Sequence, residues 1–182
     1  MSALFLWFYC LDISQALALA VSGIWIVLVL HRRYCGSRAW RAVLAALFVL
    51  ILLGILSQTV LLREPGTPQT GWLPPFASYE TLWAEGNREI LRTNLMNVLL
   101  FCPLGLFGSL LWGRSPRLWQ VLLVAAGLFA FSCGIEWVQL VTARGLCEAD
   151  DVLHNTLGAL CGGLTAWIGG RITTTPEPQK PC

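Results

Sequence analysis

The amino-acid sequence predicts an all-α integral membrane bundle of about five transmembrane helices. Hydrophobic residues make up 56% of the 182 residues and charged residues 12%, whereas a soluble domain carries about 25% charged residues. The mean hydropathy is +0.66. A transmembrane helix needs about 20 mainly apolar residues, so five such helices and their loops use nearly the whole chain. A separate soluble domain is therefore not expected.

Five apolar runs carry this prediction, and each ends at charged or turn-forming residues. They cover residues 4–30, 39–62, 94–112, 118–141 and 152–169. A run surrounded by hydrocarbon must satisfy its own backbone hydrogen bonds, as a helix does. Because Asp12 is costly at mid-bilayer, we expect the first helix to start near Ile13. No Lys or Arg precedes His31, so the first run lacks the basic start of a signal peptide and is expected to be retained.

Basic residues alternate between the two sides of the predicted bundle. One side holds Arg32, Arg33, Arg38, Arg41, Arg114, Arg117, Arg171 and Lys180. The other side holds Arg144 in its short loop, and three arginines offset by four glutamates in the loop of residues 63–93. Short loops rich in Lys and Arg stay in the cytoplasm. The sequence therefore predicts a protein that passes through a membrane several times, with an N-out, C-in orientation.

The chain divides into three parts on this basis. Residues 1–69 hold two helices and a basic cytoplasmic loop, residues 70–170 hold an outer loop and three helices, and residues 171–182 form a tail expected to be disordered. Within the outer loop, residues 78–92 are expected to form an amphipathic or re-entrant helix. A long loop of this kind is a typical place for a lid.

Several function classes are excluded or disfavoured by the composition. The net charge is only +2 and the basic residues are scattered, so no nucleic acid is expected as a partner. The seven cysteines form no CxxC and no metal-type spacing, and we interpret all of them as free thiols. No metal or cofactor is expected, and His154 is interpreted as a surface or packing residue.

Polar residues on three helices are expected to reach one level near the outer face. Glu136 and Gln139 share a face in the last turns of the fourth helix, and Asn155 lies about 6 Å below the start of the fifth helix. Asn94 and Asn97 enter at a matching depth on the third helix. A carboxylate inside a membrane is costly and usually faces a partner or a water-filled cavity, so Glu136 is the strongest single indication of a site.

Charged residues flank this level, and packing alone is the competing interpretation. Arg144 is expected to act as counter-ion for Glu136, Asp150 or Asp151. Alternatively, the polar side chains only hold the helices together, and the two aspartates cap the fifth helix. Three glycines are assigned to helix packing: Gly105, Gly158 and Gly162.

The order of these residues resembles the VanZ-like family of bacterial membrane proteins. The motif residues are Asn97, Phe101-Cys-Pro103-Leu-Gly105, Glu136-Trp-Val-Gln139, Arg144, Asp150-Asp151 and Asn155-Thr156-Leu-Gly158, with weaker matches at Pro75-Phe76 and Tyr79-Glu80. Trp72 stands where the family usually has Asn, and Glu148 stands where Asp is common. The resemblance implies a multi-pass protein of the bacterial plasma membrane with a role in the cell envelope. The family is named for a member associated with reduced susceptibility to the glycopeptide teicoplanin.

Three hypotheses follow from these residues and this resemblance. In the first, the chain binds an amphiphile such as a lipid head group, a lipid-linked wall precursor or a lipoglycopeptide. The ligand-binding residues would be Tyr79, Glu80, Asn97, Glu136, Gln139, Arg144, Asp150, Asp151 and Asn155. In the second, it is a hydrolase or transferase acting on an envelope lipid, with Glu136 as general base, Asp150 and Asp151 holding a divalent cation and Arg144 on a phosphate. The third is a small transporter, favoured by the proline in the third helix.

Overall fold

The protein is an antiparallel bundle of α-helices in a computed structural model that describes residues 13–66, 71–86 and 88–172. Its elements are α2 (Ile13–Tyr34), α3 (Arg38–Leu56), the π-helical turn η1 (Ser57–Leu61), α4 (Ala77–Glu85), α5 (Arg88–Leu110), α6 (Leu118–Thr142) and α7 (Ala149–Ile172). The described residues contain no β-strand beyond an isolated bridge between Leu73 and Glu148. The all-α prediction is confirmed. Asp12, Cys10 and the C-terminal tail of the prediction lie outside the described residues.

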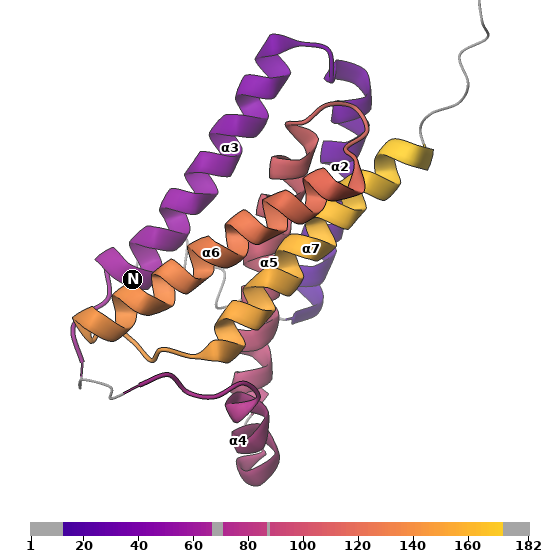
Figure 1. The fold of residues 1–182 in the computed structure, drawn as a ribbon. Helices are drawn as coiled ribbons and strands as arrows, with labels where there is room; N and C mark the ends of the chain where they lie inside the picture. The colour runs from indigo at the N-terminus through magenta and orange to yellow at the C-terminus, as the bar shows by residue number, and fades with distance from the viewer. Residues whose placement is uncertain (1–12, 67–70, 87, 173–182) are drawn as a thin grey trace, which may run out of the picture.

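The bundle has two chemically different ends (Figure 1). We call the lower end in Figure 1 the polar end; it holds η1, α4, the start of α5 and the α6–α7 connection of residues 143–148. The opposite, basic end holds the α2–α3 connection, the α5–α6 connection and the end of α7. The central helix is α5, which packs against α2, α3, α4, α6 and α7. Side chains at either end therefore converge from several helices.

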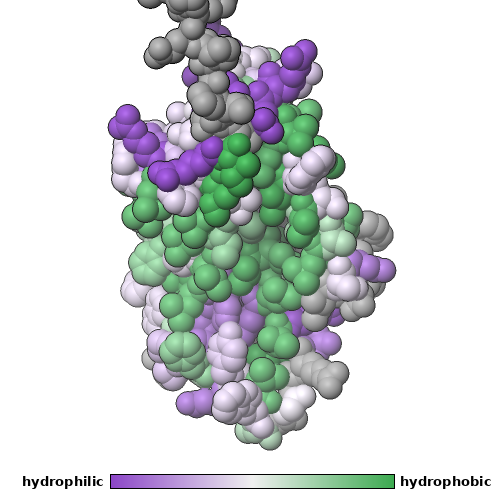
Figure 2. All heavy atoms as spheres, turned by 90° about the vertical axis from the view of Figure 1, so that its right-hand side faces the viewer, coloured by the Kyte–Doolittle hydropathy of each residue, from purple (hydrophilic) through white to green (hydrophobic). Residues whose placement is uncertain are grey.

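Four helices are long and apolar enough to cross a membrane: α2, α3 with η1, α5 and α6. Figure 2 shows hydrophobic residues covering the middle of one face, with hydrophilic residues gathered toward both ends. Trp119 and Trp137 of α6 are 52% and 59% exposed, and a helical rise of 1.5 Å per residue places them about 27 Å apart. That separation matches a hydrocarbon core of about 30 Å with aromatic residues at its two interfaces.

The expected fifth span, α7, is a helix of 24 residues, which gives it a length of about 36 Å. It is long enough to span but is less apolar than the other four, because its buried face carries His154, Asn155 and several glycines. This face packs on α5 and α6 and does not meet lipid. The passage of α7 through the membrane stays a prediction.

The contact between α5 and α7 is the most extensive in the bundle, and it depends on glycines. A Cβ atom at Gly105 would collide with the Ala159 carbonyl, and one at Gly158 would collide with the Val98 carbonyl. At Gly162 it would meet Cys102 and Leu106 backbone atoms. Small residues let two helix backbones approach closely where no hydrophobic driving force exists between helices in lipid.

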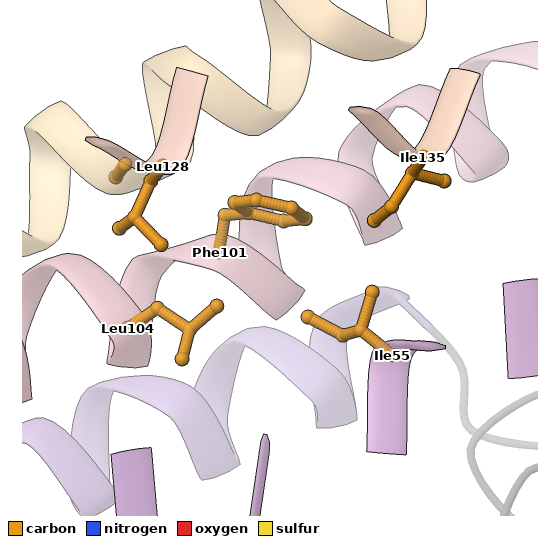
Figure 3. Close-up of a cluster of buried hydrophobic side chains, with 6 residues drawn as sticks. Ile55, Phe101, Leu104, Leu128 and Ile135 are labelled. Carbon is orange, nitrogen blue, oxygen red and sulfur yellow. The ribbon is translucent and has the colours of Figure 1, made fainter. Parts of the chain in front are cut away.

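Apolar side chains of α3, α5 and α6 fill the centre of the bundle. Phe101 and Leu104 of α5 meet Ile55 of α3 together with Leu128 and Ile135 of α6 (Figure 3). All five are nearly inaccessible to solvent. This cluster fixes α3 and α6 on either side of α5, and it thereby sets the position of the polar residues further along the same helices.

The loop between α3 and α5 forms a shorter helix than expected. Residues 78–92 were expected to be one amphipathic or re-entrant helix, but α4 ends at Glu85 and the later residues begin α5. The third apolar run starts at Asn94, so α5 extends about one and a half turns beyond it. Its helix continues through Pro103 without a break. The five described cysteines, Cys35, Cys102, Cys133, Cys147 and Cys161, are free thiols.

Candidate functional site

Asp150 of α7 anchors the start of α4. Its carboxylate accepts hydrogen bonds from the Phe76 and Ser78 backbone N–H groups and from the Ser78 hydroxyl. Phe76 has a φ of 71°, and no side chain of its own segment caps the helix. The first N–H groups of a helix have no partner within it, so Asp150 supplies that partner from a residue 72 positions away. The carboxylate is fully used by the fold.

Two further hydrogen bonds join α4 to the long helices. The Tyr79 hydroxyl lies 2.7 Å from His154 Nε2 of α7, and Asn94 of α5 donates to the Ser78 hydroxyl at 3.2 Å. His154 and Asn94 are buried. The outer-loop residue Tyr79 thus belongs to the polar cluster, while its neighbour Glu80 is exposed on α4 and forms no part of these contacts.

Deeper pairs connect α7 to α5 and α6. Asn97 donates to Asp151 at 2.7 Å, and Asn155 donates to the Ser132 hydroxyl at 2.9 Å. Ser132 and Glu136 lie one helical turn apart on the buried face of α6. The structure therefore pairs Asn97 with Asp151 and adds Ser132 as the partner of Asn155.

Glu136 is 2% exposed and accepts a hydrogen bond from the Glu148 backbone N–H at 2.9 Å. The carboxylates of Glu148 and Asp151 are close enough to interact with it electrostatically, and so is the guanidinium of Arg63. Arg63 also acts on Glu148 and Asp151. Three carboxylates therefore share one cation. We call Arg63, Glu136, Glu148 and Asp151 the acidic cluster.

Gly145 leaves room for the side chain of Arg63. A Cβ atom at Gly145 would collide with the Arg63 guanidinium, and Gly145 has a φ of +138°. Both the space and the backbone conformation favour glycine there. The glycine in the α6–α7 connection thus lets the arginine side chain lie close to the acidic cluster.

Arg144 does not have the role that the sequence suggested. It was expected to be the counter-ion of Glu136, Asp150 or Asp151, but its guanidinium donates to the Val60 and Leu61 carbonyls at 2.9 and 3.4 Å. Within the described part of the chain it makes no ion pair. The carbonyls at the end of a helix lack internal partners and carry partial negative charge, which attracts a guanidinium. The cation of the cluster is Arg63.

Gln139, like Arg144, donates a hydrogen bond to a carbonyl of η1. Its amide nitrogen donates to the Thr59 carbonyl at 3.0 Å, so Gln139 and Arg144 together satisfy three consecutive carbonyls of η1. In η1 the Leu62 N–H bonds to the Ser57 carbonyl, five residues back. These two motif residues therefore join α6 and its following loop to the end of α3.

Burial affects the charge of Glu148, which lies in the α6–α7 connection. Burial raises the pKa of its carboxyl above the usual value, and the nearby Asp151 and Asp150 raise it further, while Arg63 opposes the change. The cluster thus resists holding all its negative charges at once.

Several buried polar atoms near the cluster lack a partner. Gln139 Oε1, Asn155 Oδ1 and His154 Nδ1 have no hydrogen-bond partner within the described part of the chain. Buried polar groups are normally paired by protein or water. Together with the carboxylates, the two amide oxygens make this region rich in acceptors and poor in donors, with Arg63 as its cation.

Two cavities found between the described helices lie away from this cluster. One opens at the basic end, and the other is an apolar hollow among α3, α5 and α6. Neither is lined by Asn97, Gln139 or Asn155, which the first hypothesis places among the ligand-binding residues. Within the described residues, no group of three or more His, Cys, Asp or Glu side chains is placed to hold a metal ion.

Sequence reasoning missed Arg63, Ser78, Ser132 and Thr59. Arg63 was counted only for orientation, although it follows the second apolar run directly and so had to lie at the polar end. Ser78 and Ser132 are small hydroxyl residues with no charge to mark them. Thr59 contributes only its backbone carbonyl, and no residue type reveals that role in a sequence.

Comparison with known proteins agrees with the motif. A family model described as VanZ/LLP1 matches residues 40–170, which run from α3 to the end of α7 and cover more than two thirds of the chain. No curated protein and no solved structure matches. The matched segment contains every motif residue, the acidic cluster and the glycine contact between α5 and α7. The chain therefore belongs to the VanZ-like family of membrane proteins.

Proposed function

We propose that this protein binds the head group of an amphiphile at its polar end and thereby lowers susceptibility to glycopeptides such as teicoplanin. The amphiphile is an envelope lipid, a lipid-linked wall precursor or the lipid-bearing antibiotic itself. The binding residues are those of the acidic cluster together with Asn97, Gln139 and Asn155. Tyr79 and Asp150 hold α4 beside them.

The excess of acceptors at the polar end carries this proposal. Three carboxyl groups interact electrostatically with a single guanidinium, and the amide oxygens of Gln139 and Asn155 lack partners within the described part of the chain. A head group that brings several N–H or O–H donors satisfies these atoms. An anionic group on the same ligand pairs with Arg63. Wall precursors and lipoglycopeptides carry donors of this kind.

The orientation predicted from the basic residues supports the same conclusion. Arg32, Arg33, Arg38 and Arg41 lie at the basic end and favour its placement in the cytoplasm. The polar end then faces outward, in a bacterial plasma membrane, where glycopeptides meet lipid-linked precursors. Phe76, directly before α4, and Trp83, near its end, are exposed aromatic residues. Aromatic residues of this kind are typical of a membrane interface.

The test is teicoplanin susceptibility of a sensitive Gram-positive host that expresses the wild-type chain or a variant at equal membrane levels. Arg63→Gln removes the cation of the acidic cluster, and Glu136→Gln replaces its most buried carboxyl group by an amide. Arg92→Gln and Glu89→Gln make the same substitutions at the same end, in residues that pair with each other on α5 at 3.7 Å. We expect protection by the wild type and by both controls, and loss of protection in both cluster variants. Protection that persists in the cluster variants would falsify the proposal.

The acidic cluster also supports an enzyme as the second candidate. Glu136 is a buried carboxylate that accepts one backbone hydrogen bond, with Glu148 and Asp151 close by, and a buried carboxylate beside other carboxylates suits a general base. This candidate predicts turnover of an envelope lipid by the purified wild-type protein and none by Glu136→Gln. A protein that binds lipid but leaves it chemically unchanged, with or without Mg²⁺, excludes it.

A further inference from the structure

The basic end of the bundle contains a cavity that the proposed function does not use. Its volume is about 250 Å³, and it lies between the C-terminal parts of α2, α5 and α7. Trp25, Leu28, Val29 and Leu110 line its apolar walls. Trp25 and Val29 are exposed on α2, so the cavity opens sideways, toward the hydrocarbon that surrounds the bundle.

Two arginines lie at the mouth of this cavity. Arg32 on α2 and Arg114 in the α5–α6 connection both line it, and both are exposed. Arg114 is close enough to His31 to interact with it electrostatically. Guanidinium groups match the geometry of phosphate oxygens and are the preferred partners of phosphate in proteins. Apolar walls below a pair of guanidiniums fit a molecule with a hydrocarbon chain and an anionic head.

His31 fixes the helix that carries Arg32. Trp40 Nε1 donates to His31 Nδ1 at 2.9 Å, and His31 Nε2 lies 3.1 Å from the Gly113 carbonyl. Indole nitrogen only donates, so Nδ1 is the acceptor and Nε2 carries the proton that bonds to Gly113. His31 is therefore a neutral imidazole, and it ties α2 to the connection that carries Arg114. This contact holds together the two backbone segments that carry the arginines.

Helix dipoles act against an anion here, and the arginines outweigh them. Each of the three helix ends presents roughly half a negative charge, and the Gly113 carbonyl is already taken by His31. Arg32 and Arg114 each bring a full positive charge, and both are exposed residues that line the cavity. The balance at the mouth favours an anion.

We propose that this cavity binds an anionic phospholipid, with the head-group phosphate on Arg32 and Arg114 and an acyl chain along Trp25, Leu28 and Val29. Under the predicted orientation the basic end lies at the cytoplasmic leaflet, where anionic lipids are available and basic pockets between helices bind them. The apolar walls select a lipid over a free phosphate, because a soluble anion leaves them unfilled. The site is separate from the polar end, and it stands or falls independently of the proposed function.

Native mass spectrometry of the purified full chain tests this site with dioleoylphosphatidylglycerol and with dioleoylphosphatidylcholine. Arg32→Gln combined with Arg114→Gln removes both charges at the mouth. Arg33→Gln combined with Arg38→Gln removes two charges from the same end without touching the cavity, and it is the matched control. Arg32 and Arg33 lie at the end of α2, Arg38 lies at the start of α3, and Arg114 lies in the α5–α6 connection. All four side chains are exposed, so the variants are expected to fold. Circular dichroism checks that they do.

The expected result is one phosphatidylglycerol retained per wild-type chain and about 30-fold weaker binding in the Arg32 and Arg114 variant, from roughly fivefold for each basic residue. The control pair binds like the wild type, and phosphatidylcholine binds more weakly to all of them. The proposal is overturned if both double variants lose phosphatidylglycerol binding equally, or if the two lipids bind with equal affinity. Displacement of the lipid by glycerol 3-phosphate, or a dimer of the chain that carries no lipid, would also overturn it.

Discussion

Replacing Gly162 by alanine tests whether close backbone contact between α5 and α7 holds the bundle together. The added Cβ would collide with the Cys102 carbonyl and lie 2.8 Å from Leu106 N. Backbone atoms cannot turn aside as a flexible side chain can, so the cost lies at the upper end of overpacking, about 3 kcal/mol. Alanine recovers up to about 1 kcal/mol of helix propensity. The net loss of unfolding free energy is about 2 kcal/mol, or roughly 30-fold in the equilibrium constant.

The assay is unfolding of the purified chain by titration with sodium dodecyl sulfate, followed by far-ultraviolet circular dichroism. Gly134→Ala in α6 is the matched control, because a Cβ there meets nothing within 4 Å. We expect the control to be neutral or slightly stabilising through helix propensity. If Gly162→Ala and Gly134→Ala shift the midpoint equally, close packing at Gly162 does not stabilise the bundle and the reasoning fails.

Two further predictions concern the polar end. Asp150→Asn leaves one of the backbone N–H groups of Phe76 or Ser78 facing an amide NH₂, at a cost of about 1–3 kcal/mol. We therefore expect the amides of α4 to exchange hydrogen about 5- to 150-fold faster, measured by mass spectrometry. Unchanged exchange would show that Asp150 does not anchor α4. Because burial raises the pKa of Glu148, the folded chain keeps a proton that the unfolded chain has released. Stability therefore falls as pH rises above the usual glutamate pKa, and Glu148→Gln makes that fall less steep in the same unfolding assay. Identical slopes would contradict the effect of burial on Glu148.

Hydropathy located the helices well wherever lipid surrounds them. The run at 118–141 became α6 (Leu118–Thr142), and the run at 39–62 became α3 with η1. The helix α5 begins at Arg88, before its apolar run starts at Asn94, because a helix continues into water while hydropathy reports only the part in lipid. In α7 the hydropathy is low along the helix itself, because its buried face carries glycines and polar residues.

The depth of residues along the helices was predictable, whereas their partners were not. Depth placed Asn97 near the polar start of the fifth helix without naming a partner, and Asn97 bonds to Asp151 there. Proximity in sequence suggested Arg144 as the counter-ion, yet the chain turns at Ala143 with a φ of 52° and directs Arg144 toward η1. The direction of a loop depends on such single dihedral angles, which a hydropathy profile does not contain.

The attachment of η1 changes how loss of function at a motif residue should be interpreted. Gln139 and Arg144 donate to three consecutive carbonyls of η1, directly after α3, and truncating either side chain removes a partner from these carbonyls. A variant such as Arg144→Ala therefore releases the end of α3 from α6, whatever the protein binds. Resistance lost in that variant reports a loosened bundle as readily as a missing ligand contact. Arg63 is exposed and makes no hydrogen bond to η1 among those described. Loss of resistance in an Arg63 variant therefore indicates loss of ligand binding.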